Sequence, residues 1–166
     1  GYFYESYNLR KYKQAFIDTQ FVQDNQSKSS YGVIRGLHYQ LAPYSQSKLV
    51  RVLQGKIFDV AVDLRSNSTT FKKWVGIELS EDNMKQFFIP KGFAHGFSVL
   101  SDTAVVLYKT DCYYHKQSER GIIFNDTALN IDWKLPSEDI KVSPRDTSRP
   151  ELKNAECNFN TNSSLI

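Results

Sequence analysis

Apolar and polar side chains alternate most regularly over residues 57–64, which read IFDVAVDL. Phe58, Val60 and Val62 share one parity, and two acids, Asp59 and Asp63, lie on the other. A period of two predicts a β-strand, because successive side chains of a strand point to opposite faces of the sheet. We therefore expect one apolar face and a second face that carries two carboxylates.

The residues before this strand extend it into a predicted sheet. Residues 32–65 divide into three extended segments, interrupted at Pro43 and at Gly55. Proline cannot donate to a strand ladder and glycine favours a turn, so both positions are natural strand ends.

Shorter patterns predict the remaining elements. Extended segments are predicted over residues 1–7, 74–79, 87–89 and 103–111, a helix over residues 9–17, and turns over residues 26–30, 66–70 and 80–83. The chain is irregular from residue 116, and residues 155–166 are predicted to form a polar, flexible tail. Roughly eight to eleven short strands favour a mainly β barrel or jelly roll with a few short helices, built as one domain over residues 1–154.

Composition narrows the classes of protein. Aromatic residues make up 14% of the chain, which favours strands and ring-lined cavities. The net charge of +3 is too small to indicate nucleic-acid binding, and no apolar run approaches the roughly 18 residues that span a membrane. Cys112 and Cys157 are too few for a disulfide framework, so we expect a cytoplasmic protein. Because the chain starts inside a strand-like run at Gly1, we expect further residues upstream.

One histidine and several cations lie among the predicted strands. Strict alternation places Arg35 and His38 on opposite faces, so both reach one cavity only if the strand bulges near Gly36. Core packing of His38 and Tyr108, and solvation of Lys48, remain structural alternatives. A histidine, a phenol and several cations suit either proton transfer on an anionic small molecule or the binding of such a molecule without reaction. Neither GxGxxG nor a P-loop occurs in the sequence.

The spacing of the histidines argues against a metal site. Residues 90–95, PKGFAH, resemble the second cupin motif PxGxxH. The first motif would need HxH, but the chain has His38-Tyr39-Gln40, and no Glu follows before Lys56. Two histidines without a nearby carboxylate make a poor divalent site, so we expect none.

Several motifs in one order resemble a known family. They are RGLHYQ at residues 35–40, KLVR at 48–51, FDVAVDLR at 58–65, IPKGFAHGF at 89–97, and YKT at 108–110 followed by Tyr113 and Tyr114. With these motifs, the chain resembles the dTDP-4-dehydrorhamnose 3,5-epimerases over nearly its whole length. The resemblance implies a metal-free, cupin-type jelly roll that forms a homodimer with exchanged strands. It also implies a cofactor-independent isomerase that inverts carbons 3 and 5 of dTDP-4-dehydro-6-deoxy-D-glucose.

The resemblance implies a role for each matching residue. His38 matches the general base, and Asp146 matches the acid that pairs with it. Lys48 matches the cation at the enolate oxygen, Tyr108 the phenol that returns the proton, and Tyr114 the ring that stacks on thymine. The residues that match nucleotide or diphosphate contacts are Glu5, Gln23, Asp24, Asn25, Arg35, His95, Glu119 and Arg145.

Two other functions stay open from the sequence. An epimerase that acts on one carbon only would share His38 and Lys48, so these motifs do not separate it from a double epimerase. A non-catalytic sugar-nucleotide-binding cupin would bind dTDP without exchanging protons. Arg145 stands where the family carries a lysine, which keeps the charge but changes its geometry.

Overall fold

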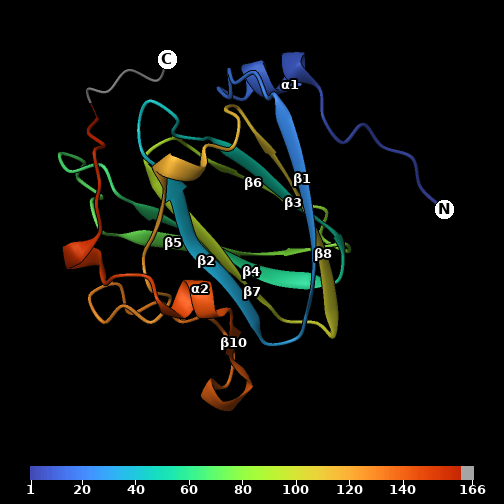
Figure 1. Ribbon diagram of the computed structural model, residues 1–166. Helices are drawn as coiled ribbons and strands as arrows, with labels where there is room; N and C mark the ends of the chain where they lie inside the picture. Colours follow the sequence, from blue (N-terminus) through green and yellow to red (C-terminus); the bar gives the residue numbers. More distant parts are fainter. Residues whose placement is uncertain (162–166) are drawn as a thin grey trace.

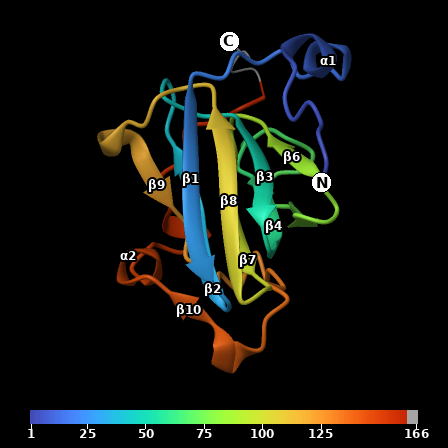
Figure 2. The same cartoon turned by 90° about the vertical axis from the view of Figure 1, so that its right-hand side faces the viewer.

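The computed structural model describes residues 1–161, which form two β-sheets packed against each other (Figure 1). The first sheet has the strand order β1-β8-β3-β6, and the second has the order β10-β2-β7-β4-β5, with β9 paired to β2. In Figure 2 the first sheet lies in front of the second. Sequence neighbours are mostly separated within the sheets, which confirms the predicted mainly β, jelly-roll fold.

The elements have the following bounds. The strands are β1 (Gln23–Ser30), β2 (Val33–Gln40), β3 (Lys48–Gln54), β4 (Lys56–Asp63), β5 (Trp74–Ser80), β6 (Gln86–Ile89), β7 (Phe93–Val99), β8 (Thr103–Thr110), β9 (Glu119–Gly121) and β10 (Lys141–Val142). The helices are α1 (Leu9–Gln14) and α2 (Pro144–Thr147), with 3-10 turns η1 (Lys116–Ser118), η2 (Ser137–Asp139) and η3 (Leu152–Asn154). Among residues 1–161, no helix is long and apolar enough to cross a membrane.

Two apolar cores stabilise the sheets. The first lies between them and includes Val50 of β3 and Val99 of β7. The second lies on the other face of the second sheet, where Val60 of β4 packs in one cluster with Trp133 from the C-terminal third of the chain. Because both faces are covered, β4 is buried along almost its whole length.

The two acids of β4 are on the face between the sheets. Asp59 is 0% exposed and Asp63 is 1% exposed, so each needs a partner for its charge. Asp63 Oδ2 lies 2.8 Å from Arg65 Nη2, and Asp59 Oδ1 lies 2.7 Å from His95 Nε2. The predicted face with two carboxylates therefore exists, and it is an interior face.

Two predictions near the N-terminus are wrong. Residues 26–30 are not a turn but the second half of β1, which pairs with β8 as far as Ser30 opposite Thr103. Their apolar signal is missing because β1 has one face toward a polar cavity and the other toward solvent. Residues 1–7 form no strand, because no other part of residues 1–161 offers them backbone partners. Their alternation leaves Phe3 99% exposed.

The predicted helix over residues 9–17 is present but ends at Gln14, followed by Phe16 at a positive φ of 63°. At the other end of the chain, part of the expected flexible tail packs on the domain. Phe159 is 6% exposed within the second core, and Asn158 exchanges two 3.0 Å hydrogen bonds with the backbone of Ala42. Residues 162–166 lie outside the described residues.

Candidate active site

A cavity of about 280 Å³ lies between the two sheets. The second sheet contributes His38 from β2 and His95 from β7. The first sheet contributes Lys48 from β3 and Tyr108 from β8. The cavity is therefore walled by titratable side chains that come from strands far apart in the sequence.

An irregularity in β2 brings Arg35 and His38 to the same cavity. The register of β2 against β7 shifts between these two residues, as the sequence required. Gly36 has a φ of +132°, and a Cβ there would lie 2.5 Å from the Cα of Gly96. Only glycine fits this conformation and this close approach of two backbones.

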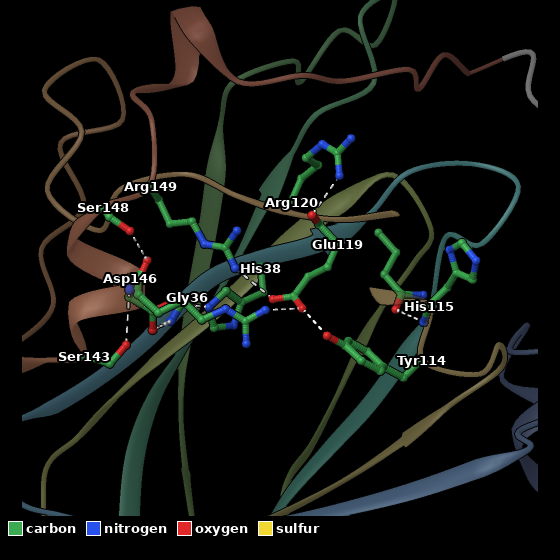
Figure 3. A network of polar contacts seen from close by, with 12 residues as sticks. Gly36, His38, Tyr114, His115, Glu119, Arg120, Ser143, Asp146, Ser148 and Arg149 are labelled. Atoms are coloured by element: carbon green, nitrogen blue, oxygen red, sulfur yellow. Dashed lines mark hydrogen bonds and ion pairs between the residues drawn. The ribbon is translucent and has the colours of Figure 1, made fainter. Parts of the chain in front are cut away.

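His38 is held by the carboxylate of Asp146. His38 Nε2 lies 2.6 Å from Asp146 Oδ1, and the Gly36 N–H donates to Oδ2 at 3.4 Å (Figure 3). Ser143 caps α2 by accepting the Asp146 N–H at 3.1 Å, and Pro144 suits the first helical position. Burial raises the pKa of Asp146, but the hydrogen bond and charge of His38, together with the Gly36 N–H and the charge of Arg149, outweigh it and leave this pKa below its usual value. Such a carboxylate orients the imidazole and stabilises its protonated form.

Lys48 supplies a cation inside the cavity. Burial lowers the pKa of its ammonium group to about 8, although the carboxylates of Asp59 and Glu119 oppose this decrease. Lys48 Nζ lies 5.7 Å from the centre of the Tyr108 ring. A desolvated ammonium at this position stabilises negative charge that develops in the cavity.

Tyr108 faces the cavity from the sheet opposite His38. It pairs with Val50 of β3 across the ladder, next to the strand end that carries Lys48. Burial raises the pKa of its hydroxyl, so the phenol is protonated at neutral pH and can donate a proton. A base on one sheet and an acid on the other thus bound one space.

A buried pair, His95 and Asp59, lies beside these groups. Burial lowers the pKa of His95, while the charge of Asp59 opposes the decrease. The ring of His95 is 6.4 Å from that of Tyr108. The other carboxylate oxygen of Asp59 has no hydrogen-bond partner among the described residues. Residues 1–161 contain no group of three or more His, Cys, Asp or Glu side chains arranged to hold a metal ion.

A second polar network in the cavity wall is centred on Glu119 (Figure 3). We call this end of the cavity the mouth, because the lining residues Arg145 and Tyr114 are more than half exposed there. The Glu119 carboxylate contacts the guanidinium groups of Arg145 and Arg149 and accepts a hydrogen bond from the Tyr114 hydroxyl. Arg35 lines the same cavity. Guanidinium groups bind phosphate oxygens with two parallel hydrogen bonds, so this end of the cavity suits a diphosphate.

Most residues assigned from the sequence meet here. The cavity is lined by Arg35, His38, Lys48, His95, Tyr108, Tyr114, Glu119 and Arg145. Asp146 lies behind His38. Gln23 and Asn25 do not line the cavity themselves but lie beside Tyr114, which does: Gln23 accepts the Tyr114 N–H at 3.2 Å and donates to Asn25 at 2.8 Å.

Two further assigned residues lie away from the cavity in this chain. Asp24 follows Gln23 in β1 and so points to the opposite face, where it binds Lys109 at 3.0 Å. Glu5 binds Lys11 of α1 at 2.9 Å and does not line the cavity.

Sequence reasoning missed other residues at the site. Gln40 shares the parity of His38, a signal that was available; it accepts the His115 N–H at 2.8 Å and donates to the Tyr44 carbonyl at 2.6 Å. Arg149 gives no such signal, because it lies in an irregular segment that only folding brings to Glu119. The further lining residues are Ser27, Tyr39, Gln46 and Phe97.

Comparison with known proteins agrees with this geometry. Residues 1–154 match the family described as dTDP-4-dehydrorhamnose 3,5-epimerase. The chain belongs to this family. The matched residues include every strand that lines the cavity.

Individual members are similar over most of their length. The dTDP-4-dehydrorhamnose 3,5-epimerase of Escherichia coli strain K12 is 54% identical over 147 residues, which are 88% of this chain and 79% of that protein. The crystal structure of the enzyme of that name from Elizabethkingia anophelis NUHP1 has a TM-score of 0.89 at 55% identity, covering 92% of this chain and 85% of that one. The dTDP-6-deoxy-D-glucose-3,5-epimerase of Legionella pneumophila Philadelphia 1, solved with dTDP-4-keto-L-rhamnose, has a TM-score of 0.88 at 50% identity and coverages of 93% and 81%.

Proposed function

We propose that this protein is a 3,5-epimerase that converts dTDP-4-dehydro-6-deoxy-D-glucose into dTDP-4-dehydro-L-rhamnose. The observation that carries this proposal is the placement of His38 and Tyr108 on opposing sheets across one cavity. Inversion removes a proton from one face of a carbon and returns one to the other face. A base and an acid on opposite sides of the sugar meet that requirement.

The substrate makes this chemistry accessible without a cofactor. A ketone at carbon 4 acidifies the protons on carbons 3 and 5, because the electron pair left behind moves to the ketone oxygen as an enolate. Reprotonation of the same carbon from the opposite face inverts it and restores the ketone. Two such cycles, one at each carbon, change no oxidation state.

Each residue at the inner end of the cavity then has a role. His38 removes the proton, and Asp146 stabilises the imidazolium that forms. The ammonium of Lys48 stabilises the enolate oxygen, and the hydroxyl of Tyr108 donates the proton from the other side. His95 borders the same space and contacts the substrate between the sugar and the diphosphate.

The mouth holds the nucleotide. Arg35 and Arg145 bind the diphosphate; the side chain of Arg145 is 61% exposed, although its guanidinium contacts Glu119. Tyr114 is 54% exposed and offers a ring face on which thymine stacks. The remaining polar contacts come from Gln23, Asn25 and Glu119.

We infer that a second copy of the chain completes the nucleotide end. Glu5 lies away from the cavity of its own chain, and the neighbouring Tyr2 and Phe3 are 76% and 99% exposed. A homodimer that exchanges these N-terminal segments buries the aromatic rings and brings Glu5 of the partner subunit to the mouth. Light scattering during gel filtration should give twice the 19.2 kDa chain mass, whereas a monomer at micromolar concentration contradicts the exchange.

We place the enzyme in the cytoplasm, where its free thiols, Cys112 and Cys157, stay reduced.

Proton NMR of the sugar in heavy water tests the activity. The double epimerase introduces deuterium at carbon 3 and at carbon 5. Deuterium at only one of these carbons would identify a mono-epimerase. Binding of dTDP with no exchange at either carbon would identify a non-catalytic binding protein.

A further inference from the structure

Glu119 places a negative charge at the mouth, where the diphosphate is to bind. Its side chain is 11% exposed and contacts Arg145, Arg149 and Tyr114. A carboxylate beside a bound diphosphate repels it unless a cation stays with the carboxylate. The partners of Glu119 therefore decide whether the mouth attracts or repels the ligand.

The two arginines differ in how firmly they are held. The side chain of Arg145 is 61% exposed, whereas that of Arg149 is 15% exposed. Arg149 Nη2 lies 2.8 Å from Glu119 Oε1, and Arg145 contacts the other carboxylate oxygen. Arg145 lines the cavity, but Arg149 does not. Arg145 can thus exchange Glu119 for a ligand, while Arg149 stays in place.

The fold makes room for Arg149 beside the strand that carries Glu119. A Cβ on Gly121 of β9 would lie 2.8 Å from Arg149 Nε and 2.9 Å from its Cδ. The Arg149 N–H donates to the Asp146 carbonyl at 3.4 Å, which ties its backbone to the end of α2. Arg149 Nε is buried without a hydrogen-bond partner among residues 1–161, so the bond from Nη2 to Glu119 is its principal side-chain anchor.

We propose that Arg149 is a positioning residue for diphosphate binding: it keeps Glu119 neutralised and in place, which frees Arg145 to bind the ligand. This inference rests on the proposed function. Without Arg149, Arg145 is the one guanidinium group among residues 1–161 that contacts the Glu119 carboxylate. A diphosphate must then either compete with Glu119 for Arg145 or leave a nearly buried carboxylate unpaired, and both weaken binding.

Calorimetric titration with dTDP tests this role. Arg149→Met should weaken dTDP binding and raise KM about tenfold, with a smaller change in kcat, because His38 and Asp146 keep their contact. Arg120→Met is the matched control, because it removes one positive charge next to Glu119 in β9. The Arg120 guanidinium pairs with Glu156 and donates to the backbone carbonyl of Glu119, but it does not contact the Glu119 carboxylate. The control should bind dTDP as the wild type does.

A second substitution separates charge compensation from simple structural support. In a Glu119→Gln background, where the charge is absent, adding Arg149→Met should cost little further affinity, so the double variant recovers most of the loss when it is compared with Glu119→Gln alone. Arg149→Lys keeps the charge but replaces the guanidinium with a single nitrogen, so its dTDP affinity should fall between those of wild type and Arg149→Met. This variant also tests the role if the methionine variant does not fold.

Three results would overturn the inference: Arg149→Met within about twofold of wild type, an equal loss in Arg120→Met, or no recovery in the double variant. Failure of the wild-type protein to bind dTDP would instead contradict the proposed function itself, and the inference with it.

Discussion

At the scale of single residues, the proposed chemistry depends on contacts that the fold assembles. His38 and Asp146 are 108 positions apart in the sequence and 2.6 Å apart in the structure. Lys48 is a cation in a desolvated place, and Tyr108 is a phenol kept protonated by burial. The partners and the burial that the fold supplies therefore set the protonation state of these side chains.

Removal of the base is the first residue-scale prediction. His38→Ala should lower solvent exchange at carbons 3 and 5 by about 10³-fold, because no other group at that position accepts the proton. Affinity for dTDP should stay nearly unchanged, since the nucleotide end of the cavity is intact. NMR exchange rates and dTDP titration measure the two effects. Wild-type turnover in this variant would contradict the mechanism.

Removal of the acid should have a different effect. Tyr108→Phe keeps the ring but deletes the hydroxyl, so proton abstraction by His38 continues while return from the opposite face does not. The variant should wash deuterium into the substrate with retained configuration and form little epimerised product. Normal inversion would mean that the proton comes from another donor, such as water.

The ammonium of Lys48 should give the reaction an alkaline limit. The pKa of Lys48 is lowered to about 8, so the cation is present below this pH and is lost as the pH rises through it. Enolate stabilisation is lost with it, and kcat/KM should fall above about pH 8. Lys48→Met should show low activity without this limb. An activity that stays constant to about pH 9.5 in the wild type would exclude the role.

At the scale of elements, the irregularity in β2 decides which side chains of this strand face the cavity. A regular strand would send Arg35 and His38 to opposite faces. The shift at Gly36 places both on the cavity wall, and the close contact with Gly96 ties β2 to β7 at this point. The irregularity of β2 therefore lies between the two side chains that it brings to one cavity.

Substitution of Gly36 tests the importance of this irregularity. Gly36→Ala adds a Cβ 2.5 Å from the Cα of Gly96 at a φ of +132°, so it should lower the free energy of unfolding by about 3 kcal/mol. Activity should fall as well, because His38 and the Gly36 N–H move relative to Asp146. Gly1→Ala is the control, since nothing lies within 4 Å of the added methyl. Urea denaturation of both variants gives the comparison.

At the scale of the whole molecule, the C-terminal third covers the second sheet. Trp133 and Phe159 share a core cluster with β2 and β4, and α2 brings Asp146 behind His38. The two sheets thus form the cavity. The irregular C-terminal segments cover the outer face of the second sheet and supply Asp146, the partner of His38. Stability and function are linked through this cover.

Truncation of Phe159 measures how much the cover contributes. Phe159 is 6% exposed, and its ring packs edge-on against Tyr39 at 5.9 Å, so Phe159→Ala should lower the free energy of unfolding by about 3 kcal/mol. Phe16→Ala is the matched control at a 97% exposed ring and should change it by less than about 0.5 kcal/mol. Equal midpoints in urea would show that residues 155–161 do not stabilise the domain.

Local pattern was sufficient for β4, where alternation is strong, and for the requirement of a bulge near Gly36, which follows from the spacing of Arg35 and His38. It failed for β1, because one face of this strand borders a polar cavity and the other borders solvent. Neither face carries apolar side chains, so no apolar alternation marks the strand in the sequence. Residues 1–7 show the opposite failure, because alternation alone supplies no partner strand. Resemblance of motifs then identified the family.

The alternation of side chains, the breaks at proline and glycine and the presence of His38, Lys48 and Tyr108 on strand-like segments are properties of the chain itself, because they depend on residues a few positions apart. The contacts of Asp59 with His95 and of Arg149 with Glu119 arose only on folding. Neither member of such a pair carries a mark of the other in its own neighbourhood. The pairs exist because buried charges must find partners wherever the packing of sheets and loops brings them together.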